Sequence, residues 1–297
     1  MILTKNTRIY LKFLLFLWLI AITLRIGFLA WQWESLSAFS WEDIAKAFYI
    51  GVRFDGRIAA FMSLPLLVFL FTPFLSRFFG NVRPFLLGFY VIAFAFDILI
   101  YIADFAHYAY LNSRVNFAAV GLLEDTKEAL GMIWQTYPVI KLLLVLVVVV
   151  AILTLCAKTI LNKWVYAKNA LSHKITSAFA TLFMLVILIY GQYGIVYYPL
   201  RWSEAYFSGY NQITALGLNP IQNLADTRPQ NFYVDNTEQA RKAYPNTAKY
   251  LGVQNPNADS IRYDRFSQAA GGGDKPNIVI IVIESMSTHK SSLMFDE

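Results

Sequence analysis

Residues 275–287, KPNIVIIVIESMS, contain the clearest strand signal in the chain. Six consecutive β-branched residues, 278–283, lie between the turn-forming GGGD of residues 271–274 and the polar end of the segment. Such a run is typical of a short strand that is buried on both faces of a parallel sheet. Glu284 ends the run, and ligands of open α/β sheets bind beyond the carboxyl ends of strands, so this carboxylate is a candidate metal ligand. The alternative is an acidic residue that contacts solvent or caps the next helix.

The composition of the whole chain is that of a membrane protein. Hydrophobic residues make up 57% of the 297 positions and aromatic residues 16%, whereas about half of an ordinary soluble domain is apolar. The net charge of +6 arises mainly in short loops between hydrophobic runs. The sequence contains no Lys/Arg cluster interleaved with aromatic residues, so its charge does not indicate a nucleic-acid partner. The single cysteine, Cys156, excludes a disulfide framework and a cysteine-based metal site.

Five hydrophobic runs are long enough to cross a bilayer as helices. The first run follows Lys5, Arg8 and Lys12 and lacks a small-residue cleavage site, so we expect an uncleaved helix rather than a signal peptide. The expected fold class is therefore an α-helical membrane protein, with a five-helix transmembrane domain over residues 1–200. The five predicted spans cover residues 13–31, 58–75, 85–103, 139–157 and 176–198.

The charges of the loops predict the orientation of these spans. The N-terminus and the loops after the second and fourth spans contain Lys and Arg but no acidic residue. The loops over residues 32–55 and 104–137 contain more acidic than basic residues. Cytoplasmic loops are enriched in Lys and Arg, so the N-terminus is predicted to be cytoplasmic and the chain after residue 198 extracytoplasmic.

The composition changes again after residue 200. Residues 201–274 are rich in Asn, Gln and charged side chains, and they are predicted to form an extracytoplasmic linker with short helices. One short helix is expected after Asn219-Pro220, and another begins near Asn236 and runs toward Tyr244. The three glycines at 271–273 provide a hinge before the predicted strand.

The five-span layout, the linker and the KPN-strand-ESMS segment together resemble the N-terminal part of lipoteichoic acid synthase-like phosphoglycerol transferases, which belong to the sulfatase and alkaline phosphatase superfamily. The resemblance implies that residues 275–297 begin an α/β catalytic domain of alkaline phosphatase-like fold. It also implies that Glu284 is a ligand of a divalent metal, Mn²⁺ rather than Zn²⁺. In this family a metal-bound threonine attacks the lipid phosphodiester, and that nucleophile is expected downstream of Glu297. No catalytic residue is therefore assigned within this chain, and the fragment alone is expected to be inactive.

The function implied by the resemblance is transfer of phosphoglycerol from phosphatidylglycerol to a glycan or lipid acceptor of the cell envelope. The expected location is the outer face of a bacterial cytoplasmic membrane. One alternative is a related phosphoethanolamine transferase, for which Zn²⁺ and another lipid headgroup are expected. A second alternative, from a different class, is a catalytically incomplete membrane module that serves in binding, regulation or transport.

Two charged residues lie inside the predicted spans. Arg25 and Asp97 each lie twelve residues from the inner end of a span, which places both about 18 Å from the inner edge of the hydrocarbon. Isolated charges at this depth are costly, so we expect the two side chains to pair or to face a shared polar cavity. The alternative is that Arg25 extends to the outer headgroups while Asp97 bonds to a neighbouring hydroxyl group.

A second group of polar residues lies near the outer ends of the second and third spans. Asp104 shares one face of the third span with Asp97, and Arg53 and Asp55 precede the second span. These residues form a candidate lipid-headgroup site, and His107 lies one position from the same face. Helix packing and aromatic anchoring at the membrane interface explain the same pattern without a ligand.

Overall fold

The computed structural model describes residues 3–71, 82–121, 126–163, 171–192, 197–228, 237–265 and 279. All regular secondary structure in these ranges is helical. The elements are α1 (Lys5–Trp31), α2 (Trp33–Leu36), α3 (Trp41–Phe71), α5 (Val82–Leu111), α6 (Ala118–Gly121), α7 (Thr126–Thr136), α8 (Val139–Leu161), α9 (Leu171–Tyr190), the 3₁₀ helix η1 (Trp202–Tyr206), α10 (Asn211–Gly217), α11 (Pro220–Asp226) and α12 (Thr237–Leu251).

The chain divides into two compact units, Met1–Gln230 and Asn231–Glu297. The first unit contains the membrane helices, and it extends beyond the predicted domain boundary at residue 200. Residues 197–228, which the composition assigned mainly to the linker, pack against α3 and α5 through η1, α10 and α11. We refer to residues 197–228 as the docked connector.

Three helices of the first unit are long and apolar enough to cross a membrane, namely α1, Arg83–Leu111 within α5, and α8. They match the first, third and fourth predicted spans, so the helical-membrane part of the expected fold class is confirmed. Only 6% of the most apolar window of α8 is buried inside the protein. Leu144, Val147 and Leu155 are each at least 60% exposed, so this helix presents an apolar face that suits contact with lipid chains.

The second and fifth predicted spans correspond to α3 and α9, but both differ from the prediction in their limits. α3 begins at Trp41 rather than Ile58, because the Ser40 hydroxyl accepts a hydrogen bond from the Asp43 backbone N–H and caps the helix. The charges of residues 53–57 therefore lie inside a helix and not in a loop. α9 ends at Tyr190, eight residues before the predicted end at 198, because Gly191 adopts a positive φ of 70° that terminates the helix.

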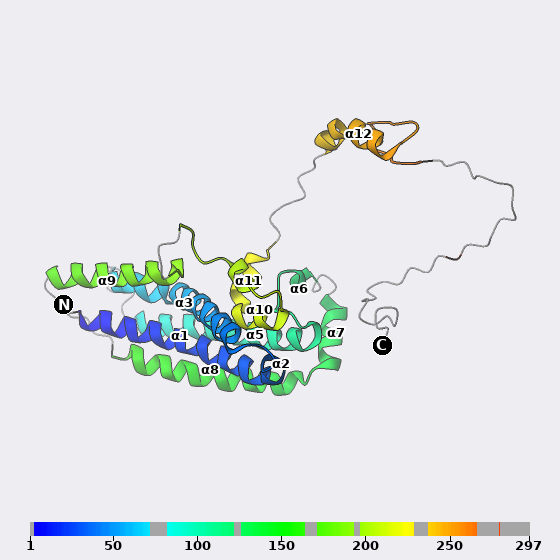
Figure 1. Cartoon of the computed structure of the whole chain (residues 1–297). Coiled ribbons are helices and arrows are strands. Elements are labelled where there is room, and N and C mark those ends of the chain that lie inside the picture. The colour runs from blue at the N-terminus through cyan, green and yellow to red at the C-terminus, as the bar shows by residue number, and fades with distance from the viewer. Residues whose placement is uncertain are drawn as a thin grey trace. The chain divides into compact units, whose positions relative to one another are not determined.

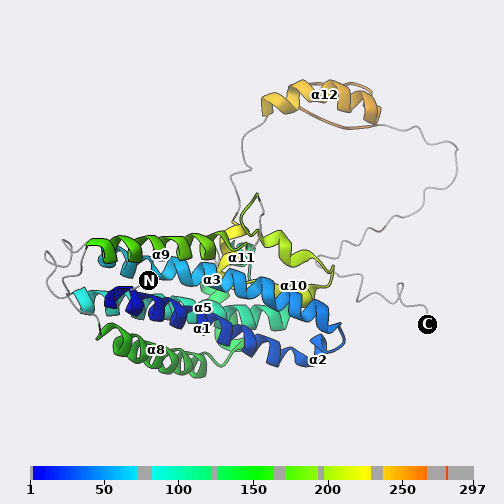
Figure 2. The same cartoon turned by 60° about the vertical axis from the view of Figure 1, so that its left-hand side comes forward.

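The membrane unit is a bundle in which α1 packs mainly against α3, and α5 mainly against α8. α9 packs against α3, and α8 and α9 lie on opposite sides of the bundle (Figures 1 and 2). Aromatic rings fill the contact between α1 and α5, where the centroids of Phe13 and Tyr90 are 4.6 Å apart. Both side chains are fully buried, as are Tyr10 and Phe94. This apolar core fixes α1 against α5, and both helices contribute polar residues to the site described below.

The second unit contains α12 (Thr237–Leu251), which continues through Pro245 beyond Tyr244, toward which the sequence predicted it to run. Tyr244 is 1% exposed and fixes the following turn: its hydroxyl donates to the carbonyl of Arg262 and accepts from the backbone N–H of Asn257. These contacts hold the end of α12 against residues 256–263.

The predicted strand 278–283 is described only at Val279. This residue has no regular secondary structure and is 81% exposed, in contrast to the buried strand position that the sequence suggested. Within the described ranges there is no strand with which this segment could pair, and a lone strand is not stable in water. Glu284 and the rest of the segment lie outside the described residues.

Candidate functional site

A buried ion pair joins α1 to α3. The guanidinium group of Arg25 donates from Nε and Nη2 to the two carboxylate oxygens of Asp55, and both distances are 2.7 Å. The Arg25 residue is 2% exposed and Asp55 is fully buried. Two parallel charge-assisted hydrogen bonds of this kind fix the orientation of both side chains as well as neutralising them.

The same ion pair also holds the docked connector. Arg25 Nη1 donates to the carbonyls of Leu216 and Leu218, the latter at 3.1 Å. The Asn219 side chain donates to Asp55 Oδ1 at 2.9 Å and to the Tyr101 hydroxyl at 3.2 Å. The side-chain oxygen Oδ1 of Asn219 meanwhile caps α11 by accepting from the backbone N–H groups of Ile221 and Gln222. One connector residue thus joins α11 to α3 and α5.

A second buried ion pair holds the connector from the side of α5. Arg114 Nη1 donates to Asp104 Oδ2, while its Nε donates to the Ala215 carbonyl at 2.8 Å. The Arg114 guanidinium also lies over the Phe28 ring, 3.7 Å from the centroid. Together with Arg25, this residue satisfies carbonyl groups at the C-terminal end of α10 that have no partner within the helix. We refer to Arg25, Asp55, Tyr101, Asp104, Arg114 and Asn219 as the connector network.

The C-terminal end of α9 is held by two other arginines of α3. Arg53 Nε donates to the Gly191 carbonyl at 2.5 Å, and Arg57 Nε donates to the Ile189 carbonyl at 2.7 Å. Arg53 also contacts Gln192 and Glu204, whose side chains bond to each other. Cations at a helix C-terminus are favourable because they neutralise unpaired carbonyls and the helix dipole. Within the sequence GVRFDGR at residues 51–57, Arg53 and Arg57 therefore contact the end of α9. Asp55, which lies between them, contacts α1.

The structure corrects the expected partner of Arg25. The predicted pair with Asp97 is wrong, because Arg25 forms its ion pair with Asp55. Asp97 is 6% exposed on α5, one helical turn before Tyr101 in the network. This partner was not predictable from the hydropathy pattern, which places Asp55 in a loop before the second span, whereas Asp55 lies inside α3.

The four residues of the predicted lipid-headgroup site do not form one open site. Asp55 and Asp104 are fully buried, and each carboxylate accepts hydrogen bonds from within the protein. Arg53 is 7% exposed and faces α9 rather than the network. His107 bonds through Nδ1 to the Ser113 carbonyl at 2.8 Å. A headgroup would have to displace these bonds, so the geometry favours the packing interpretation of this pattern.

Comparison with protein-family models, curated proteins and solved structures gave no match. Within the described residues, no group of three or more His, Cys, Asp or Glu side chains is placed to hold a metal ion. The predicted metal ligand Glu284 lies outside the described residues, so its role as a ligand of Mn²⁺ stays a prediction.

What the connector network can do follows from its burial and pairing. Its charges neutralise one another and bond to backbone carbonyls of residues 215–218, so the connector is fixed to the membrane helices. Sequence reasoning missed Arg114 and Asn219 as members of this network. The Asn219-Pro220 pair did identify a helix start, since Asn is a preferred N-cap and Pro suits the first helical position. The partner of the Asn219 amide had no signal in the sequence.

Two glycines with positive φ provide a test of how tightly the end of α9 is packed. A Cβ atom at Gly191 would lie 2.9 Å from Leu200 Cβ and 3.3 Å from Arg57 Nη2, whereas one at Gly209 would meet no atom within 4 Å. Both glycines have φ between 60° and 70°. We expect Gly209→Ala to lower the free energy of unfolding by about 1 kcal/mol through backbone strain alone. Gly191→Ala should cost about 1–3 kcal/mol more through overpacking.

The measurement is equilibrium unfolding of the purified protein in mixed detergent micelles. Equal losses in the two alanine variants would contradict the close packing of Leu200 on Gly191.

Proposed function

We propose that the chain is the membrane-anchored part of a metal-dependent transferase that moves phosphoglycerol from phosphatidylglycerol to a cell-envelope acceptor. The observation that carries this proposal is the order of two features: a helical membrane unit comes first, and the sequence KPNIVIIVIESMS at residues 275–287 follows it. That order resembles the lipoteichoic acid synthase-like transferases. Glu284 is the proposed ligand of a divalent cation, Mn²⁺ in preference to Zn²⁺, which would neutralise charge that develops on the transferred phosphoryl group.

The proposed topology has five crossings, made by α1, α3, α5, α8 and α9, with a cytoplasmic N-terminus in a bacterial inner membrane. Two contacts support it. The backbone N–H of Thr4, before α1, donates to Ser177 near the start of α9 at 3.0 Å. The far end of α9 contacts α3 and the connector through Arg53 and Glu204. The N-terminus and the connector thus lie toward opposite ends of α9, as an odd number of crossings requires.

The connector network supports the proposal because it fixes the chain after the last span to the membrane helices. A catalytic domain that acts on a lipid must be held close to the bilayer, where its substrate headgroup lies. A connector fixed by two buried ion pairs limits the freedom of the chain between the last span and residue 228. This restriction lowers the entropy that is lost when the domain and its lipid substrate are brought together.

The decisive experiment measures metal-dependent release of diacylglycerol from phosphatidylglycerol vesicles by the complete protein. Removal of divalent cations by a chelator should abolish release, and Mn²⁺ should restore it. Glu284→Ala should lower the rate by about 100-fold or more. Loss of a residue that only orients a metal ligand lowers activity about 10–100-fold, and loss of the ligand itself should lower it further. The matched control is Glu238→Ala, an exposed acidic residue of α12, which should keep full activity.

Three results would contradict the proposal in different ways. Release from phosphatidylethanolamine instead of phosphatidylglycerol, with Zn²⁺ as the active metal, would favour a phosphoethanolamine transferase. Activity that survives Glu284→Ala would show that Glu284 is not a ligand of the catalytic metal. Complete inactivity on every phospholipid, with a folded protein, would favour the membrane binding, regulatory or transport module.

A further inference from the structure

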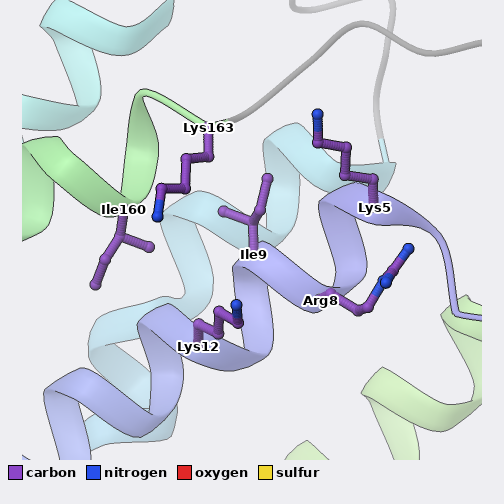
Figure 3. Close-up of a pocket in the computed structure, with 6 residues that line it drawn as sticks. All are labelled: Lys5, Arg8, Ile9, Lys12, Ile160 and Lys163. Carbon is purple, nitrogen blue, oxygen red and sulfur yellow. The ribbon is translucent and has the colours of Figure 1, made fainter.

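A basic pocket lies at the end of the bundle opposite the docked connector. It is formed between the first turns of α1 and the last turn of α8, with a cavity volume of about 290 Å³. Figure 3 shows Lys163, just past α8, directed toward α1 on the side where Lys12 and Ile9 lie. The residues that line this pocket are Lys5, Arg8, Ile9, Lys12, Ile160 and Lys163.

The cations of α1 are arranged on one face of a rigid helix. Lys5, Arg8 and Lys12 are spaced by three and four residues, so all three project from the same side of α1. The start of this helix is fixed, because the Thr4 hydroxyl accepts from the backbone N–H of Thr7 at 3.2 Å and Thr4 N–H donates to Ser177. The floor of the pocket is also fixed, since Ile9 is 5% exposed and belongs to the main apolar core. The pocket is therefore a preformed feature.

In the part of the chain that the structure describes, the positive charge of this pocket has no acidic ion-pair partner, since no carboxylate pairs with any of its four cations. The connecting sequences at this end, residues 72–81 and 164–170, contain no Asp or Glu, and the first acidic residue of the chain is Glu34. Four like charges around one cavity repel one another unless an anion binds between them.

We propose that this pocket binds the phosphate headgroup of an anionic phospholipid in the leaflet on the N-terminal side of the membrane. Basic pockets between transmembrane helices on the cytoplasmic side are suited to such headgroups. A lipid fits better than a soluble anion because an apolar surface continues from the pocket along α8, where Leu155 is 60% exposed and Ile152 is 54% exposed. The lining Ile9 and Ile160 provide apolar contact at the boundary between headgroup and acyl chain. The inference is independent of the proposed transferase activity.

The test measures binding of the purified chain, in neutral detergent micelles, to a fluorescent phosphatidylglycerol analogue, with a phosphatidylcholine analogue as the uncharged reference. We expect selective binding of the anionic lipid. Lys12→Gln and Lys163→Gln should each weaken it by about fivefold, and the double variant by about 25-fold, as expected for cations close to lipid phosphate. All of these side chains are exposed, so the substitutions should leave the fold unchanged, and circular dichroism checks this.

The matched control is Lys158→Gln. Lys158 is an exposed lysine in the last turn of α8, five residues before Lys163, but it does not line the pocket. Equal losses for Lys158→Gln and Lys163→Gln would overturn the proposal in favour of general surface charge. Full competition by inorganic tripolyphosphate at lipid-equivalent concentration would also overturn it, because the ligand would then be a soluble polyanion. Binding of both lipid analogues with the same affinity would exclude a headgroup site.

Discussion

Replacing Arg25 with methionine should lower the free energy of unfolding by about 3–5 kcal/mol, since a buried ion pair that loses one partner leaves the other charge uncompensated. Asp55 is fully buried and would keep the Asn219 amide as its side-chain donor. The carbonyls of Leu216 and Leu218 would lose their donor as well. The loss should appear in equilibrium unfolding of the protein in mixed micelles. It should also appear as faster proteolysis within residues 197–228.

A double-mutant cycle separates this ion pair from simple loss of packing. Asp55→Leu alone should be about as damaging as Arg25→Met, because it leaves the guanidinium charge buried. The double variant should be more stable than the sum of the two losses predicts, since neither charge remains. Arg8→Met, an exposed arginine of the same helix, is the matched control and should change stability by less than about 0.5 kcal/mol. Additive losses in the cycle would show that the two residues act separately.

The sequence predicted the membrane helices better than the contacts between them. Apolar length depends only on neighbouring residues, so α1, α5 and α8 were identified from hydrophobicity. The start of α3 was not predicted, because Arg53, Asp55 and Arg57 lower the hydropathy of a segment that is nevertheless helical. Their charges are buried against α1 and α9, which a local pattern does not report.

For the connector network, too, the sequence predicted individual residues but not the contacts between them. Arg25 was predicted as a costly intramembrane charge, and Asp55 and Asp104 were predicted as candidate headgroup residues. All three are members of one network. Two of their partners were not predicted: Asn219 contacts Asp55 from 164 residues away along the chain, and Arg114 contacts Asp104 from 10 residues away. Burial of a charge can be inferred from one position, whereas the identity of its partner depends on the packing of distant segments.

Replacing Gly51 with alanine should lower the free energy of unfolding by about 2–3 kcal/mol, although alanine is the better helix former. Gly51 lies one turn before Asp55 on α3, where the Arg25 guanidinium passes directly over the helix backbone. A Cβ atom at this position would lie 2.6 Å from Arg25 Nε and closer still to Cζ and Nη1. The guanidinium group cannot move away without breaking its two bonds to Asp55. Unfolding in mixed micelles measures the loss.

Two comparisons test whether the guanidinium group is the cause. Gly27 lies in α1, two residues from Arg25, and a Cβ atom there would meet nothing within 4 Å. Gly27→Ala should therefore be neutral or stabilise the protein by up to about 1 kcal/mol. In an Arg25→Ala background the side chain that blocks position 51 is gone, so Gly51→Ala should no longer destabilise. A loss that persists in that background would mean that position 51 tolerates no side chain for another reason, and that the close approach of Arg25 to α3 is not what requires glycine.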